Sequence, residues 1–455
     1  MSLFAKKNRS ALALGAIAVS LLMGAATLTL PSVANAATVL KVATSSAVTT
    51  WDPIQSFSTE AFYMTNIYEP LLWKNADGAK TEYTPAIATS WSHSTDGLTW
   101  TFKIRQDATF HDGAAVTAAA VKASLETAKK SAGASFIWDP VKTFDAPSVD
   151  TLVMNLTYPA PMDLIASSTY GAWIISPAAL AALAKDPKYF ESGIDGGTGP
   201  YKIQSYKAGS EVVLAAFTKH WSKVMPAYSI VDALITPDGV TAQQMMTSGQ
   251  VDWSSNIPLT SIASFKTDPK YTVKTYASPF NFVGYFNTLR APLNNPKVRQ
   301  AISWAIPYRD IVAIGGQGFG SQARGPVPRG IFPFDPKTPY YAQNLNKAKK
   351  MLADAHVKDL KLKITFASEN SSEARFVPLI QSALESIGVK VEIQAMLFNQ
   401  QWAAAKKDPA NAQDIFIVYY WPTYSDAGAD NLYSLFHSSA KPFFNLSYWK
   451  SPDYD

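Results

Sequence analysis

The sequence predicts an α/β protein with two or three domains. The chain has 455 residues, which is too long for one ordinary hydrophobic core. Residues 98–104 alternate apolar and polar side chains, and this two-residue period indicates a strand with one buried face. Between residues 344 and 420, stretches with strand character alternate with stretches of helical spacing. Such alternation is typical of a parallel sheet with right-handed helical crossovers.

The N-terminus has the pattern of a secretory signal peptide, residues 1–36. Lys6, Lys7 and Arg9 precede an apolar run over 11–30, and Ala34-Asn35-Ala36 supplies a small-residue cleavage site. The run is long enough to span a bilayer, so an uncleaved anchor is the alternative. Cleavage would remove three positive charges and lower the net charge from +5 to +2. A charge so near zero, without a basic cluster, argues against a nucleic-acid partner.

Composition excludes cysteine chemistry. The chain has no cysteine, so it forms no disulfide, no thiolate metal site and no cysteine nucleophile. Charged residues make up 16% of the chain and aromatic residues 12%. This balance suits a soluble protein with an aromatic-lined cleft, although large cores use the same side chains.

Residues 85–130 form one predicted compact unit. Its clearest strand has the apolar positions Leu98, Trp100, Phe102 and Ile104. Asp96-Gly97 tolerates positive φ, so residues 86–92 are expected to fold back as the partner of a hairpin. A second turn at 111–113 follows, and Thr117 can then cap a helix over 118–128.

The same unit carries a resemblance to a known family. Residues 85–91, 96–105 and 110–113 resemble the signature of the bacterial extracellular solute-binding proteins of the dipeptide, oligopeptide and nickel group, family 5. The stretch 295–306, with Val-Arg-Gln-Ala-Ile, is a second close match. The resemblance implies a periplasmic binding protein-like fold (type II, cluster C), a Venus flytrap of two α/β lobes plus an extra small domain. It also implies an ABC importer with permease and ATPase subunits as partners.

The resemblance divides the chain into a signal peptide and three domains. Domain I comprises 37–70 and 195–285, domain II 71–194, and domain III 286–455. The lack of cysteine removes the lipid-modified residue that tethers many such receptors, so we expect the protein to be free in the periplasm. We also expect a monomer that needs no cofactor. The final residues, 445–455, resemble a family stretch after which other members continue. We therefore expect a fragment that lacks the closing C-terminal segment.

In domains I and II, the predicted elements follow one another as short strands and helices. A strand over 39–43 precedes a polar loop, and Pro70 stops a helix whose Glu69 we interpret as structural. The alternation of Leu152, Met154 and Leu156 indicates a strand. The remaining predictions are a helix near 178–185, a hairpin around 207–210, strands at 227–235 and 251–252, a helix at 241–248 and a strand crossing between lobes at 281–287.

In domain III, cap residues and glycines delimit the elements. Asn295-Pro296 opens a helix that Pro307 ends, and Gly388 ends the helix over 372–387. Further predicted helices cover 344–355 and 400–406, and predicted strands cover 360–366, 389–395 and 415–420.

Candidate ligand contacts lie where predicted strands end. In open α/β sheets the carboxyl ends of strands face the ligand crevice. The candidates are Tyr420, Trp421, Tyr424 and Asp426 after the last strand, and Ser45, Ser46 and Trp51 after the first. For the aromatic residues, plain packing is the alternative.

The resemblance adds a detail at Trp421. Peptide binders of the family have a Trp followed shortly by an Asp that pairs with the peptide ammonium. Here the third position after Trp421 is Tyr424, and the first acid is Asp426. An unpaired ammonium would be costly in a desolvated cleft, so a nickel complex, a sugar or another small solute stays open beside a di- or oligopeptide.

Other functional classes lack their motifs. The Gly-rich stretches 196–201 and 315–320 do not have the flanking residues or elements of a phosphate loop or a dinucleotide fingerprint. The histidines are scattered without metal-ligand spacing: His93, His111, His220, His356 and His437. No hydrolase motif is present, so we expect no enzyme. A periplasmic chaperone or sensor accessory protein is a further alternative.

Overall fold

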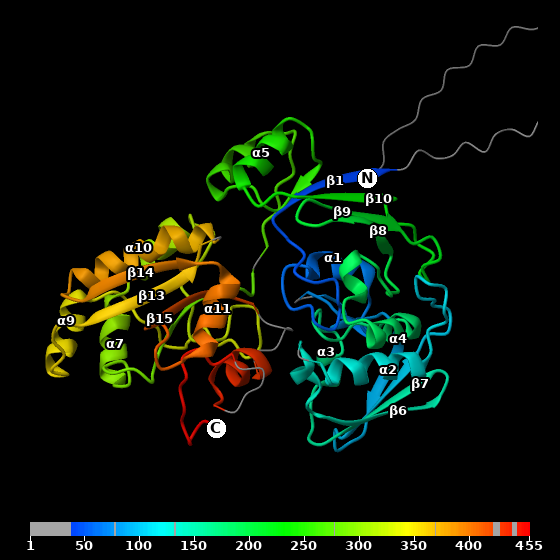
Figure 1. Ribbon diagram of the computed structural model, residues 1–455, viewed down its shortest axis with the longest axis horizontal. Helices are drawn as coiled ribbons and strands as arrows, with labels where there is room; N and C mark the ends of the chain where they lie inside the picture. Colours follow the sequence, from blue (N-terminus) through cyan, green and yellow to red (C-terminus); the bar gives the residue numbers. More distant parts are fainter. Residues whose placement is uncertain are drawn as a thin grey trace, which may run out of the picture. The chain divides into compact units, whose positions relative to one another are not determined.

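The computed structural model describes residues 38–455 except 77–78, 132, 277, 369, 422–427 and 439–443, and leaves the side chains of 428–430 undescribed. The predicted signal peptide lies outside the described residues. Within the described part, the strands form a five-stranded sheet, two four-stranded sheets and a two-stranded ribbon, and the two-residue strand Trp253–Ser254 lies at one edge of the largest sheet (Figure 1).

The five-stranded sheet has the order β11-β1-β10-β9-β8. Its strands are β1 Val39–Thr44, β8 Tyr201–Lys207, β9 Glu211–Ala216, β10 Ile230–Ile235 and β11 Trp253–Ser254. β1 runs parallel to β10 and β11, whereas β8, β9 and β10 pair antiparallel in sequence. This arrangement confirms the predicted first strand and hairpin. The small strand expected at 251–252 begins at Trp253 instead.

Two helices accompany this sheet. α1, Ala61–Ile67, ends before Pro70, as predicted. α5, Gly239–Thr247, begins where the Asp238 side chain accepts a hydrogen bond from the backbone N–H of Thr241 at 2.7 Å. Gly249 then takes a positive φ of 73°, which glycine adopts without strain.

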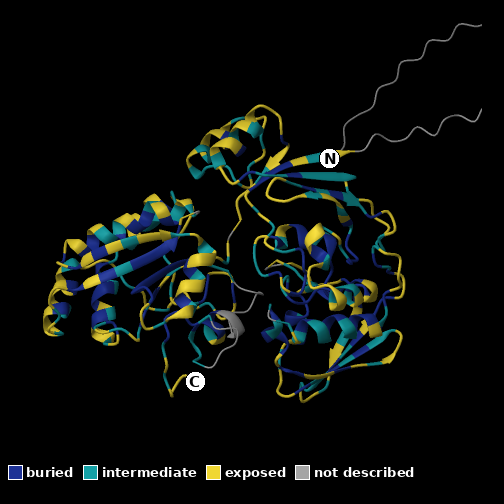
Figure 2. Cartoon of the chain, viewed as in Figure 1, coloured by how far each residue is buried: buried dark blue, intermediate teal, exposed yellow. Residues whose placement is uncertain are grey.

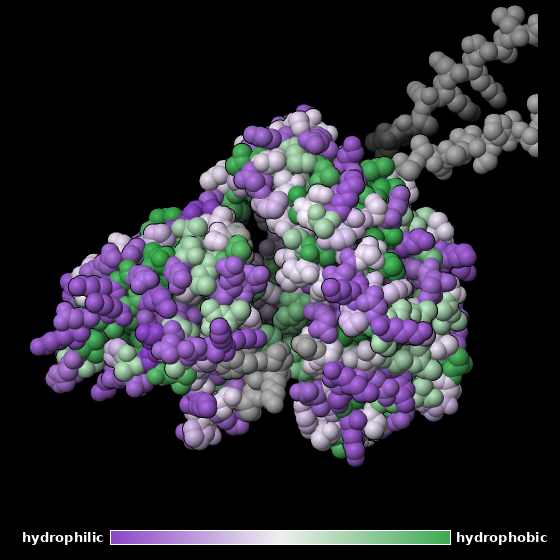
Figure 3. Space-filling model, in the orientation of Figure 1, coloured by the Kyte–Doolittle hydropathy of each residue, from purple (hydrophilic) through white to green (hydrophobic). Residues whose placement is uncertain are grey.

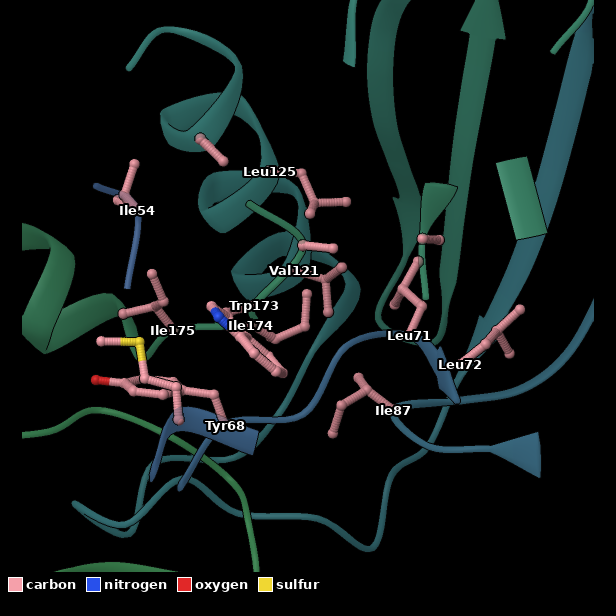
Figure 4. Packing of buried hydrophobic residues seen from close by; sticks show 14 of the residues in the cluster. Ile54, Tyr68, Leu71, Leu72, Ile87, Val121, Leu125, Trp173, Ile174 and Ile175 are labelled. Carbon is pink, nitrogen blue, oxygen red and sulfur yellow. The ribbon is translucent and has the colours of Figure 1, made fainter. Parts of the chain in front are cut away.

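The second sheet has the order β4-β5-β7-β6 and confirms the predicted compact unit. Its strands are β4 Ala88–His93, β5 Thr99–Ile104, β6 Val141–Ser148 and β7 Thr151–Leu156. α2, Ala118–Lys129, covers it, and Thr117 caps this helix by accepting from the N–H of Ala120 at 3.1 Å. Figure 4 shows Val121 and Leu125 projecting from α2 into the cluster that contains Leu71 and Trp173.

Short elements complete this half of the chain. They are the ribbon strands β2 Leu72–Lys74 and β3 Tyr83–Pro85, the helices α3 Met162–Ile165, α4 Pro177–Lys185 and α6 Ile262–Thr267, and the 3-10 turns Ser135–Trp138, Tyr189–Ser192 and Leu259–Ser261.

The glycines of 196–199 allow a close backbone approach. The N–H of Gly199 donates to the carbonyl of Ile67 at 2.8 Å. A Cβ atom on Gly197 would lie 1.9 Å from that same oxygen, so no larger residue fits. These glycines therefore let the backbone of 197–199 pack directly against the C-terminal end of α1. This close approach accounts for a Gly-rich sequence that lacks phosphate-loop features.

The third sheet has the order β12-β15-β13-β14. Its strands are β12 Asn281–Phe286, β13 Lys361–Ala367, β14 Lys390–Met396 and β15 Ile415–Tyr420. β13 runs parallel to β14 and β15, which confirms the predicted parallel lobe. Its helices are α7 Pro296–Ala305, α8 Tyr308–Asp310, α9 Leu345–Asp354, α10 Ser371–Glu385 and α11 Phe398–Lys407, and wider turns span Ile311–Gly315 and Gly428–Ser434.

Both faces of β15 are buried, which accounts for its continuous apolar sequence. Ile415 and Ile417 belong to the cluster beneath α7, α9 and α10, whereas Phe416 and Val418 belong to a second cluster with Ala405 of α11. Figure 2 colours strands of this sheet as buried. On the outside, hydrophilic side chains gather over α9 (Figure 3), which exposes Lys347, Lys349 and Lys350.

The stretch 281–287 is predicted as a strand that crosses between lobes, and the structure has the strand β12 there. β12 pairs antiparallel with β15 along its whole length, from Asn281 with Tyr420 to Phe286 with Ile415, so it belongs to the third sheet. The domain boundary at 285 stays a prediction. The apolar sequence of β12 suits a sheet edge as well as a crossing segment, so alternation alone could not distinguish them.

Candidate ligand-binding site

An apolar pocket of about 130 Å³ lies at the carboxyl end of β15. It is lined by Phe57, Ser58, Phe398, Trp402, Val418, Tyr419, Tyr420, Trp421 and Phe444. α11 supplies Phe398 and Trp402, and the end of β15 supplies the run from Val418 to Trp421. The pocket therefore combines the end of an internal strand, a helix and two segments distant in sequence.

Aromatic rings form most of the wall. Phe57 and Phe444 stack with centroids 5.8 Å apart and ring planes at 13°. Trp402 is tilted against Phe444 at 5.8 Å, and Phe398 lies 5.8 Å from Trp402 and 6.3 Å from Trp421. Such a wall offers flat apolar surfaces for a ligand side chain.

Two polar groups border this apolar wall. The indole N–H of Trp421 is buried and has no hydrogen-bond partner among the residues that the structure describes. The ammonium of Lys406 lies 5.1 Å from the ring centroid of Trp402 and 5.2 Å from that of Phe444. Burial lowers the pKa of Lys406 below its usual 10.5. Among the described residues, the pocket thus combines aromatic faces, an indole N–H without a partner and a nearby cation.

The candidates after β15 divide into two groups. Tyr420 and Trp421 line the pocket. Tyr424 and Asp426 lie outside the described residues. Their roles as ligand contacts stay predictions.

The candidates after β1 do not line this pocket. Ser45 is exposed, and the backbone N–H of Ser46 donates to the Thr44 hydroxyl at 3.1 Å. Trp51 is only 1% exposed, and its ring lies edge-on to Tyr206 with centroids 5.2 Å apart. The large ring of Trp51 thus packs in the core. The roles of Ser45, Ser46 and Trp51 as ligand contacts stay predictions.

Seven pocket residues were not among the predicted contacts: Phe57, Ser58, Phe398, Trp402, Val418, Tyr419 and Phe444. A signal existed for two of them. Phe398 and Trp402 are four residues apart, which places them on one face of a helix next to the predicted strand end. Phe57 and Phe444 reach the pocket only through tertiary folding, so no local pattern marks them.

A wider hollow of about 540 Å³ lies elsewhere, between residues 259–266 and 313–319. Its lining includes Lys266, Gln317 and Phe319. None of the predicted ligand contacts that the structure describes borders it. We therefore base the candidate site on the pocket beside β15.

The buried histidines serve packing in the described structure. The Nδ1 of His111 is hydrogen-bonded to the Asp195 carboxylate at 2.5 Å, and its Nε2 faces the Gly199 carbonyl at 2.9 Å. His220 lies 3.4 Å from Glu69, whose carboxylate also accepts from the Trp221 indole at 3.0 Å. This agrees with a structural Glu69. Across the described residues no group of three or more His, Asp or Glu side chains could hold a metal ion.

Comparisons with known proteins agree on one family. A sequence model described as "Bacterial extracellular solute-binding proteins, family 5 Middle" matches residues 82–443. The probable D,D-dipeptide-binding periplasmic protein DdpA of Escherichia coli K12 is 28% identical over 392 residues, which cover 85% of this chain and 72% of that protein.

Solved structures share the fold. The periplasmic binding protein DppA of Helicobacter pylori, in complex with the peptide STSA, superposes with a TM-score of 0.80 at 24% identity, covering 91% of this chain and 84% of that one. AgaA of A. tumefaciens R10, in complex with agropinic acid, gives a TM-score of 0.77 at 26% identity with the same coverage. Among the described residues, no helix is both long and apolar enough to cross a bilayer.

Proposed function

This chain belongs to the bacterial extracellular solute-binding proteins of family 5, and from that premise we propose that its solute is a di- or oligopeptide. As a member of this family it is a solute-binding receptor of an ABC importer. The relative DdpA is named for D,D-dipeptides, and the DppA structure contains a peptide. Peptides are therefore the first class to test.

The observation that carries the proposal is the aromatic pocket at the end of β15, with Lys406 beside it. A pocket of about 130 Å³ accommodates a side chain rather than a whole peptide. The ammonium against Trp402 and Phe444 favours an anionic group nearby, such as a peptide carboxylate. The indole N–H of Trp421 can donate to a peptide carbonyl, which would satisfy a buried donor.

Capture of the solute works through exclusion of water. An apolar wall gains free energy when a ligand side chain covers it. The removal of water also strengthens each hydrogen bond and charge contact within the closed site. A receptor that closes around its ligand presents a loaded form to the permease that differs from the empty form.

The proposal includes the cellular setting. The receptor acts in the periplasm as a free monomer after removal of residues 1–36, without a lipid anchor. It delivers the solute unchanged to the permease and ATPase subunits, with no cofactor, no catalysis and no nucleic acid.

Native mass spectrometry of the purified protein tests the solute class. We expect a co-purified species with the mass of a short peptide. A nickel complex, a sugar or another small solute in its place would replace the peptide proposal while keeping the receptor. Turnover of the bound species would contradict the receptor role, and absence of permease genes beside this gene would favour a chaperone or sensor accessory protein.

A further inference from the structure

We propose that Glu60 positions the ligand-binding wall formed by Phe57 and Ser58. The inference rests on the proposed function, because it assigns a role in binding to a residue outside the pocket. Glu60 is fully buried, with 0% of its surface exposed. It immediately precedes α1 and follows the loop 49–58.

The Glu60 carboxylate accepts five hydrogen bonds from this loop. Oε1 accepts from the Ser56 hydroxyl at 2.9 Å and from the backbone N–H groups of Phe57 at 3.0 Å and Ser58 at 2.9 Å. Oε2 accepts from the hydroxyl and the backbone N–H of Thr49, at 2.7 and 3.4 Å. Every donor therefore belongs to one loop.

Within the described part of the chain, no Lys, Arg or His forms an ion pair with this carboxylate. A buried carboxylate without a cation is unfavourable unless hydrogen bonds replace its hydration. The five donors provide that replacement only while the loop keeps its conformation. The two acceptor oxygens of Glu60 thus favour one arrangement of the loop over the others.

That arrangement fixes the pocket wall. Phe57 and Ser58 line the pocket, and the Phe57 ring contacts Phe444 and, at 5.1 Å, Tyr170. The same corner also holds the loop after β1. The Thr59 hydroxyl donates to the Ala47 carbonyl at 2.7 Å, and the Tyr63 hydroxyl donates to the Ser46 carbonyl at 2.8 Å.

The two carboxylate oxygens of Glu60 accept from different parts of the loop, so substitutions of Glu60 should weaken the loop to different extents. In Glu60→Gln, the amide oxygen can keep the three donors of Oε1, and the Thr49 hydroxyl can rotate to accept from the new NH₂ group. Glu60→Asp is one methylene shorter and cannot reach both halves of the loop. Glu60→Ala removes every acceptor and leaves the N–H groups of Phe57 and Ser58 without partners.

The experiment combines amide hydrogen exchange of Phe57 and Ser58 with binding of the tripeptide Ala-Phe-Ala by calorimetry. We expect Glu60→Ala and Glu60→Asp to exchange at least about tenfold faster at both amides and to bind about tenfold more weakly. Glu60→Gln should stay within about threefold of the wild type in both measurements. The control Glu126→Ala, at a partly exposed position of α2, should change neither.

Each outcome decides the proposal. If Glu60→Ala does not fold, Glu60→Asp and Glu60→Gln still give the comparison. Exchange and affinity unchanged in Glu60→Asp, or a Glu60→Gln variant as impaired as Glu60→Ala, would overturn it. If the wild type does not bind the tripeptide, the peptide proposal fails, whereas the exchange rates still decide the role of Glu60.

Discussion

Phe57 and Phe444 stack face to face with centroids 5.8 Å apart, although one lies near the start of the described chain and the other near its end. Phe57 packs on the core of the N-terminal domains, whereas Phe444 packs on that core and on the cluster around Phe416 and Val418. The stack therefore connects two separate cores at the pocket. We expect ligand binding to depend on it.

Replacement of Phe57 by Ala tests this dependence. The variant removes one pocket wall, so we expect Ala-Phe-Ala to bind about tenfold more weakly, equivalent to about 1.4 kcal/mol. Calorimetric titration measures the change. Phe62→Ala is the matched control, because Phe62 is exposed and stacks on Trp253, outside the pocket. Equal affinities of the Phe57 variant and the wild type would show that the ring is not a ligand wall.

The Lys406 ammonium predicts a preference for anionic ligands. In Lys406→Met, the apolar stem is kept and the charge is lost, so peptides with a free carboxylate should bind about three- to tenfold more weakly. Peptide amides should bind as they do to the wild type. The ratio of the two dissociation constants is the quantity to measure. Lys407→Met, at an exposed neighbouring position, should leave this ratio unchanged.

Asp52 predicts a pH dependence of stability. Burial raises the pKa of its carboxyl above 3.8, although hydrogen bonds from the backbone N–H groups of Ile54 and Gln55 oppose this. A raised pKa in the folded state means that Asp52 favours folding at low pH and that this contribution is lost as the pH rises through the folded-state pKa. Asp52→Asn keeps an acceptor for Ile54 and does not titrate. The Tm of this variant should exceed that of the wild type at about pH 7 and match it at about pH 3.5.

Asp150 predicts the opposite pH dependence of stability. The hydroxyls of Ser148 and Thr151 lower the pKa of its carboxyl to about 2. Its contribution to stability is therefore present above pH 3.8 and lost as the pH falls through about 2. Asp150→Asn should lower the Tm at about pH 7, the reverse of Asp52→Asn. Shifts of the same sign in both variants would contradict this explanation.

The buried pair of His111 and Asp195 is predicted to stabilise the N-terminal domains. Asp195 also accepts from the backbone N–H of Ile203 at 2.9 Å. Asp195→Ala leaves the His111 Nδ1 and that N–H without their partner, so we expect a loss of about 1–3 kcal/mol in the free energy of unfolding. Urea titration measures the loss. A loss no larger than that of Asp310→Ala, at an exposed position, would argue against a stabilising pair.

Local patterns predicted the elements that local forces determine. The alternation over 98–104 gave β5, and the caps Thr117 and Asn295 mark where α2 and α7 begin. Tyr420 and Trp421 were predicted from the rule that strand ends face the ligand, and both border the pocket.

The other features of the fold and the site depend on contacts between residues distant in sequence. β12 reads as any apolar strand, and only its pairing with β15 assigns it to the third sheet. Trp51 follows a strand end, but its ring is buried in the core, where it packs against Tyr63 and Tyr206. Phe57 and Phe444 meet across the pocket, and Glu60 holds Phe57 through contacts with backbone groups. No local pattern in the sequence predicts such contacts.

A crystal structure of the protein with its co-purified solute tests the central claim most directly. We predict electron density for an unmodified small solute against Trp421, Trp402 and Phe57, with its side chain in the pocket at the end of β15. Density in the hollow beside Lys266 and Phe319 instead, or a solute chemically altered by the protein, would contradict the account.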